Sequence, residues 1–279
     1  MTIVLAGPSI SVDGPTPQAP EYRLLDTAEV RTDNRALLGA DVWSYPTGLG
    51  KLYAPCLTGT FADKDLDNEM LSSLFGSFGV YYPVTCSALG LDIDEIVTRA
   101  RITADAVESE AVEREFRNGI AQPDNPFLND ANLAILNTGD GPRVSLAVLE
   151  RAIAGTGRKG MIHVDPGVAT ALAGANLVTT AGDVMRTMLG TPVVVGHGYY
   201  TDSSGDDLYA PDGGTNAVLE ASGWAYATGP VIVYRGRELA LRSVGHDVND
   251  YAVVIEREYL VEWDTALQAA VLIDFTTEP

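Results

Sequence analysis

The feature that most limits the possible folds is a long alternation of residue types near the end of the chain. The apolar or aromatic side of the alternation, interrupted by one arginine, comprises Tyr251, Val253, Ile255, Arg257, Tyr259, Val261 and Trp263. The positions between them include Glu256, Glu258 and Glu262. A period of two means that one face of a strand is packed while the other faces water. Strands usually run about five or six residues, so this pattern predicts an unusually long strand with an architectural role.

Composition disfavours several classes of function. The chain has 279 residues, 46% of them hydrophobic, which suffices for one large domain or two modest ones. Lysine and arginine total 18 against 38 aspartates and glutamates, a net charge of −20 that disfavours a nucleic-acid-binding module. We expect no membrane span and no signal peptide, because no apolar run is long enough and the N-terminus lacks basic residues. Cys56 and Cys86 are expected to be buried apolar residues, not a disulfide or a metal site.

The first ninety residues show no helical periodicity. Residues 1–45 are rich in glycine and proline and predict an extended N-terminal arm that is ordered mainly by its neighbours. Residues 46–90 place two strand-like pieces around the acidic DKDLDNE and predict a long projecting hairpin. A two-stranded projection is marginal in water, so it needs a neighbouring surface.

A long helix is predicted over residues 92–118. Asp92 and Glu95 have the spacing of a capping box, and Gly119 is placed to end the helix. One apolar stripe runs along it, formed by Ile93, Ile96, Val97, Ala100, Ala104, Val107 and Ala111. Such a helix is about 40 Å long and is expected to span the body of the fold.

The middle of the chain mixes helices and strands, which predicts an α+β fold. Residues 123–142 are expected to form a loop, followed by a helix over about 144–154 that ends at Gly155. The strand MIHV comes next, and Asp165 with Pro166 then opens another helix. Further short strands are expected around Val193–Val195, Trp224–Tyr226 and Val231–Tyr234.

No motif supports a catalytic, cofactor or metal site, and we assign no residue to any of the three. GTGRKG at 155–160 matches a dinucleotide-binding pattern, but it follows a helix and enters a strand, which is the reverse of the required context. The histidines His163, His197 and His246 are scattered and have no converging partners. The acidic loop TDSSGDD at 201–207 lacks the calcium-binding spacing and is interpreted as a solvated loop.

Carboxylates gather on the second half of the long predicted helix. They are Glu108, Glu110, Glu113 and Glu115, with Arg114 and Arg117 among them. Glu113 and Arg117 have the spacing of a helical ion pair. We expect this side of the helix to be solvated or to face another subunit.

Taken in order, these elements resemble the major capsid protein of tailed bacteriophages, which has the Hong Kong 97 fold. Local strings similar to capsid proteins of actinobacterial phages are VESEAVEREFRNG at 107–119, MIHVDPGVATALAGANLV at 161–178, LGTPVVVGHGY at 189–199 and WAYATGPVIVYRG at 224–236. The resemblance implies an N-terminal arm at 1–45, an extended loop at 46–90, a peripheral domain with the spine helix at 91–139, an axial domain at 140–245 and peripheral return strands at 246–279.

The same resemblance implies a structural subunit without enzymatic activity. It would assemble into pentamers and hexamers of an icosahedral head, in the host cytoplasm, and would enclose double-stranded DNA without sequence-specific binding. Portal, scaffold and decoration proteins are further candidate partners, and no membrane is expected. Some members of the fold join subunits by a lysine–asparagine bond. Lys51 or Lys64 would be the donor here, but no matching asparagine and glutamate are evident.

Three alternatives stay open at this point. The first is an encapsulin-like compartment shell with the same fold, enclosing cargo enzymes instead of a genome. The second is an acidic α+β enzyme with a site near His163, His197 or the loop 201–214. The third is another virion component, such as a tail or decoration protein.

Overall fold

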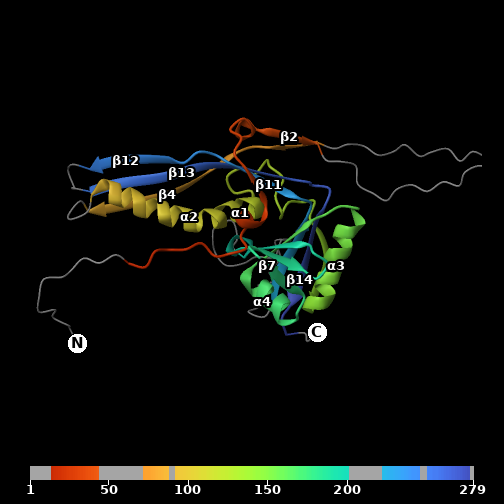
Figure 1. The fold of residues 1–279 in the computed structure, drawn as a ribbon. Coiled ribbons are helices and arrows are strands. Elements are labelled where there is room, and N and C mark those ends of the chain that lie inside the picture. The colour runs from red at the N-terminus through yellow and green to blue at the C-terminus, as the bar shows by residue number, and fades with distance from the viewer. Residues whose placement is uncertain (1–13, 44–71, 88–91, 201–221, 246–249, 277–279) are drawn as a thin grey trace, which may run out of the picture.

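The computed structural model describes residues 14–43, 72–87, 92–200, 222–245 and 250–276 (Figure 1). Within these ranges the protein contains a five-stranded sheet, a seven-stranded sheet and a two-stranded sheet. The predicted α+β class is confirmed. No helix in these ranges is long and apolar enough to cross a membrane.

The long predicted strand and the long predicted helix pack against each other. Strand β13 (Asp250–Trp263) runs along helix α2 (Ile93–Asn118) at one end of the molecule (Figure 1). A core cluster joins them, comprising Ile96, Val97, Ala100, Ala104, Val253 and Ile255. The predicted alternation of β13 is confirmed at Val253, Ile255, Tyr259, Val261 and Trp263, which are buried. It fails at Leu260, which lies on the side predicted to face water but is also buried. Cys86 lies half-buried at the edge of the same cluster, so it is less buried than predicted.

The predictions for the two ends of α2 are confirmed only in part. Gly119 ends the helix in the left-handed conformation, with φ of 59°. Asp92 occupies the position before the first turn, but its side chain makes no capping hydrogen bond, so the predicted capping box is wrong. The apolar stripe ends at Ala104, because Val107 is exposed. Val112 and Phe116 then continue the packing into the main core.

The five-stranded sheet is built around β13. On one side β13 pairs antiparallel with β4 (Phe78–Ser87). On the other side it pairs antiparallel with β11 (Val231–Arg235) and then with β12 (Leu239–Gly245). Strand β1 (Glu29–Arg31) adds to β11 in parallel. The length of β13 lets it serve as the central strand for partners from three parts of the chain.

The seven-stranded sheet has the order β5-β14-β10-β6-β9-β8-β7. Its strands are β5 (Ala134–Asp140), β14 (Gln268–Asp274), β10 (Ser222–Thr228), β6 (Met161–Val164), β9 (Pro192–Val195), β8 (Val184–Thr187) and β7 (Val178–Ala181). Helices α3 (Pro142–Gly155) and α4 (Pro166–Gly174) contribute to one core cluster with one face of this sheet. The opposite face packs in the main core with the second half of α2. The predicted cap at the start of α4 is confirmed, since the Asp165 side chain accepts from the N–H groups of Gly167 and Val168.

The N-terminal residues dock on their own chain. Helix α1 (Leu24–Thr27) contacts α2 and β9, and a short turn, η1 (Ala36–Leu38), follows β1. Strand β2 (Ala40–Trp43) then pairs with β3 (Ser72–Phe75). The prediction that residues 1–45 depend mainly on neighbours is therefore wrong for the described part that includes α1 and β1. The first strand of the predicted hairpin at 46–90 lies outside the described residues, whereas the second, β4, pairs with β13, so that part of the prediction is wrong.

The two sheets divide the chain differently from the predicted domain boundaries. Strands β11 and β12 lie N-terminal to the boundary at 245, yet they pair with β13. Strand β14 lies C-terminal to it, yet it belongs to the seven-stranded sheet. Strand β5 replaces part of the loop predicted at 123–142. These differences arise because pairing partners are far apart in sequence, which residue patterns do not report.

Candidate functional site

The most buried polar cluster joins the N-terminal residues to α2. The fully buried carboxylate of Glu113 accepts hydrogen bonds from the Arg23 guanidinium (3.3 Å) and the Leu24 N–H (3.1 Å). It also accepts from the Ser109 hydroxyl (3.1 Å) and the Gly198 N–H (3.3 Å). We call these five residues the Glu113 socket. A charged group this deeply buried is tolerated because donors surround it on several sides.

Two glycines make room for the socket. A Cβ atom at Gly196 would lie 2.1 Å from Oε2 of Glu113, and one at Gly198 would lie 2.5 Å from the Glu113 Cβ. The GHG segment belongs to the short turn η2 (His197–Tyr199), which packs on α2. Next to it the Val195 N–H donates to the Tyr22 carbonyl at 2.8 Å. The N-terminal residues are thus held by the carboxylate and by the end of β9.

Burial shifts the titration of two groups in this region in opposite directions. Burial raises the pKa of Glu113 to about 7, and Arg23 and the surrounding donors offset only part of this effect. Burial lowers the pKa of His163 to about 3. The two ring nitrogens of His163 bond the hydroxyls of Tyr199 (3.1 Å) and Thr228 (2.9 Å). With both nitrogens engaged inside the core, His163 is a neutral structural residue and has no nitrogen left for a metal or a substrate.

A second buried carboxylate of α2, Glu108, forms a larger network. Glu108 bonds Arg235 of β11, Arg257 of β13 and the Tyr259 hydroxyl. Asp105 contributes a further contact to Arg257, at 3.4 Å. We call these five residues the Glu108 network. It fastens the middle of α2 to the five-stranded sheet.

Most of the acidic side of α2 is therefore not solvated or subunit-facing as predicted, although Glu110 and Arg114 are partly exposed. Glu108, Glu113, Glu115 and Arg117 are all buried within the chain. The ion pair of Glu113 is with Arg23, whereas Nε of Arg117 donates to the Tyr226 hydroxyl at 3.1 Å. These partners lie elsewhere in the sequence, so the helical spacing of Glu113 and Arg117 was a misleading signal.

The other candidate positions form no reactive constellation. The half-exposed His197 lies 3.3 Å from Glu110. At 155–160, Gly155 ends α3 and the chain enters β6, as predicted. Among the described residues no group of three or more His, Cys, Asp or Glu is arranged to hold a metal ion. His246, Cys56, Lys51, Lys64 and the loop 201–214 lie outside the described residues.

Large apolar side chains are exposed on three surfaces of the described chain. At one end of the β2–β3 sheet these are Trp43 and Leu74. On the side of β4 and β12 opposite α2 they are Tyr81, Leu239 and Leu241. The third surface lies beside α3 and includes Val144, Met188 and Leu189. Exposed apolar groups gathered in this way are typical of protein–protein contact.

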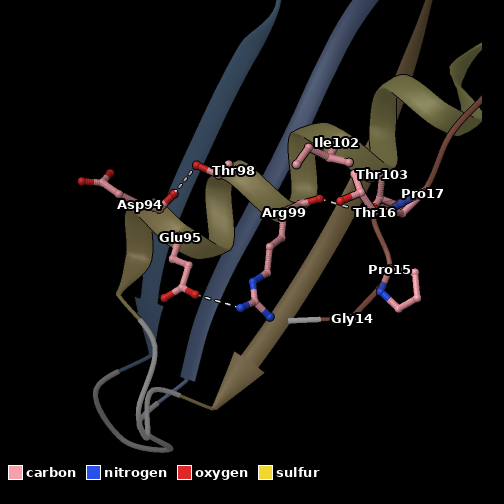
Figure 2. A pocket seen from close by; sticks show the side chains of 10 residues that line it. All are labelled: Gly14, Pro15, Thr16, Pro17, Asp94, Glu95, Thr98, Arg99, Ile102 and Thr103. Atoms are coloured by element: carbon pink, nitrogen blue, oxygen red, sulfur yellow. Dashed lines mark hydrogen bonds and ion pairs between the residues drawn. The ribbon is translucent and has the colours of Figure 1, made fainter. Parts of the chain in front are cut away.

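A groove of about 630 Å³ lies between α2 and the N-terminal residues (Figure 2). Figure 2 shows residues 14–17 running beside the first turns of α2, with the ion pair between Glu95 and Arg99 (2.8 Å) on the helix side. Its polar lining includes Thr98 and Thr103, whose hydroxyls bond the helix backbone. The groove presents no group suited to catalysis.

Comparison with known proteins gives a consistent answer at the level of the fold. No protein-family model matches the sequence, and no curated protein matches it. The capsid of a native GTA particle is 16% identical with a TM-score of 0.57, covering 97% of this chain and 95% of that chain. The SrpI encapsulin of Synechococcus elongatus is 10% identical with a TM-score of 0.57, covering 99% and 95%. A chain of Mycobacterium phage Adephagia is 13% identical with a TM-score of 0.56, covering 99% and 96%.

Identities this low establish no shared activity, but the matches span nearly the whole of both chains. They confirm, for the fold, the resemblance to phage capsid proteins seen in the sequence. This chain therefore has the fold of subunits that build a GTA particle capsid and an encapsulin complex.

Proposed function

We propose that this chain is the major capsid subunit of a tailed bacteriophage and that it assembles into a closed icosahedral head. The observation that carries the proposal is the fold shared, over 97% of this chain, with the capsid of a GTA particle. The buried charges support it, because the described polar clusters hold the subunit together and offer no reactive group. No residue is assigned a catalytic role.

In this proposal α2 and β13 are the spine helix and long strand of a Hong Kong 97-type subunit. The segment 1–45 is the N-terminal arm, and 46–90 contains the extended loop, apart from β4, which belongs to the five-stranded sheet. The seven-stranded sheet is the core of the axial domain. The five-stranded sheet is the core of the peripheral domain. Copies meet in pentamers and hexamers, where each subunit offers the same surface to its neighbours.

The net charge of −20 is consistent with a container for double-stranded DNA. An acidic wall adheres weakly to a polyanion, so packaged DNA can slide along it and leave. Assembly would take place in the host cytoplasm, and the finished subunit would reside in the virion. Portal, scaffold and decoration proteins remain candidate partners.

The encapsulin alternative is kept because an encapsulin matches with the same TM-score of 0.57. The two functions differ in their contents, so particles purified from producing cells should be treated with nuclease and then opened. We expect protected double-stranded DNA of uniform length. Particles that contain a cargo enzyme and no protected DNA would overturn the phage proposal in favour of the compartment. Boiling the same particles in detergent tests the cross-link at Lys51 or Lys64, because clean 29.6 kDa monomers would exclude it.

A further inference from the structure

The outer side of α3 carries an apolar groove of about 400 Å³ that nothing in the described chain covers. Its lining includes Arg143, Ala147, Arg151, Leu177, Met188 and Leu189, and we call it the α3 groove. Residues 143, 147 and 151 are four apart and share one face of the helix. Met188 is 68% exposed and Leu189 is 79% exposed, although both are large apolar side chains. Figure 1 shows α3 at the periphery of the molecule.

The groove is bordered by two arginines that have no carboxylate partner among the described residues. Among the described residues, neither Arg143 nor Arg151 forms an ion pair. The one acid in the lining, Glu150, is bonded to the hydroxyls of Thr187 (2.5 Å) and Thr191 (2.8 Å). Unpaired arginines are unexpected in a chain where acidic residues outnumber basic ones by 38 to 18.

A second cavity, of about 590 Å³, continues the basic surface. It shares Glu150, Ala154 and Leu189 with the α3 groove and adds Lys159 and Arg186, together with Glu29 and with Arg158, which is ion-paired to Asp264. Lys159 is exposed and forms no ion pair with any described residue. Residues 142–192 contain five arginines and lysines against three acids, so this stretch of a strongly acidic chain carries a net positive charge.

We infer that the α3 groove binds an acidic segment of a second copy of this chain, with apolar side chains on the groove floor and carboxylates on Arg143 and Arg151. The inference rests on the proposed assembly into shells and names one of its contacts. The apolar floor favours a protein partner over nucleic acid, because an apolar core with a polar rim is characteristic of protein interfaces. The charge favours a second copy, because the rest of the chain is a surplus of carboxylates complementary to this patch.

Zero-length cross-linking with a carbodiimide tests the contact on assembled shells. Arg151→Lys keeps the charge and places an amine in the α3 groove, and Lys159 provides a native amine beside it. Shells assembled from a mixture of ¹⁴N- and ¹⁵N-labelled subunits distinguish links between copies from links within one copy. We expect mixed-isotope links from Lys159 and from the new lysine to aspartate or glutamate. These links should be absent from unassembled protein.

Charge reversal gives an independent readout. Arg143→Glu with Arg151→Glu should raise the protein concentration needed for shell formation by on the order of tenfold or more, since like charges would then face each other. The matched control is Arg35→Glu with Arg237→Glu, which adds the same charge at exposed positions outside the groove and should change that concentration little. Circular dichroism of the unassembled variants verifies that both fold.

The outcomes separate this inference from the proposed function. One outcome is that wild-type shells form while the lysines link only within one copy and the charge-reversed variant assembles like its control. In that case the inference about the groove is wrong and the proposed function stands. Protection of Lys159 from labelling only in DNA-filled particles would assign the cations to nucleic acid and would also overturn it. If the wild-type chain forms no shells under any assembly condition, both statements fail together.

Discussion

Glu108 and Glu113 lie five residues apart on α2 and are both buried, yet they hold different parts of the molecule. The Glu108 network connects α2 with β11 and β13, so it lies inside the rigid body of the fold. The Glu113 socket connects α2 with the N-terminal residues at Arg23 and Leu24. The first therefore stabilises the body of the subunit. The second fixes the N-terminal segment, which adds β1 to the five-stranded sheet and buries Leu24 in the main core.

The two carboxylates also differ in how many positively charged side chains neutralise them. Glu108 has two arginines as partners, whereas Glu113 has one arginine and otherwise neutral donors. Burial accordingly raises the pKa of Glu113 to about 7, so the socket takes up a proton near neutral pH. One helix thus carries a carboxylate that joins it to the five-stranded sheet and a second carboxylate, with a raised pKa, that joins it to the N-terminal residues.

The largest effect is expected from Glu108→Ala. The substitution removes the closest carboxylate of Arg235 and Arg257 but leaves both of them Asp105. Removing one partner of a buried ion pair costs about 3–5 kcal/mol, and the retained partner places the expected loss at the lower end, about 3 kcal/mol. Urea denaturation of the unassembled protein should show a loss of this size in the free energy of unfolding. A loss below about 1 kcal/mol would mean that the network does not fasten α2 to the sheet.

A smaller and more local effect is expected from Glu113→Gln. The amide keeps one acceptor oxygen but replaces the other by an NH2 group that faces hydrogen-bond donors, so we expect a loss of about 2 kcal/mol. Hydrogen exchange should quicken at the Leu24 amide, while the amides of β13 stay protected. Equal acceleration in both places would contradict the idea that the socket holds a separable segment.

The stability of the folded protein is expected to depend on pH through Glu113 and His163. The pKa of Glu113 is raised on folding, so its contribution to stability is complete below about 4.5 and is lost as pH rises through about 7. The pKa of His163 is lowered, so its contribution is complete above about 6.5 and is lost as pH falls toward about 3. Between about pH 4.5 and 6.5, the stability contributed by Glu113 therefore falls as pH rises, whereas the stability contributed by His163 increases.

Single substitutions should reveal separately how Glu113 and His163 make stability depend on pH. From pH 6.5 to 4.5, Glu113→Gln should lose stability on acidification by about 1.4 kcal/mol per pH unit relative to wild type, because only His163 still titrates. His163→Asn should show the opposite trend, gaining stability on acidification. Thermal unfolding at several pH values measures both. Parallel curves for wild type and both variants would refute the assignment.

The smallest effect is expected at the exposed end of α2. The ion pair of Glu95 with Arg99 lies on the surface with helical spacing, so Glu95→Gln should cost about 0.3–0.5 kcal/mol. It serves as the control for both buried carboxylates. A loss comparable to that of Glu108→Ala would show that burial does not set the order of these effects.

The sequence predicted the parts of the fold that are governed by local pattern. The alternation over 251–263, the helix ending at Gly119 and the cap at Asp165 all depend on neighbours within a few residues. Strands β5, β7 and β8 were missed because they are short or irregular and gain their stability from pairing within the seven-stranded sheet.

The buried charges could not be predicted in the same way. Glu113 finds Arg23 about ninety residues away, and Glu108 finds Arg257 still further along the chain. One local pattern pointed to a buried neighbour at this place. The glycines at 196 and 198 come after an apolar strand and leave space for a neighbouring side chain. Without the fold, nothing identifies Glu113 as the group that fills it.

The most direct test of the proposed shell subunit is electron microscopy of the purified full chain under assembly conditions, combined with sedimentation velocity on the same sample. We predict closed shells of uniform diameter in the micrographs and a fast, narrow boundary far above the 29.6 kDa monomer. A single slow boundary at the monomer mass across all concentrations and conditions, with no particles in the micrographs, would contradict the account.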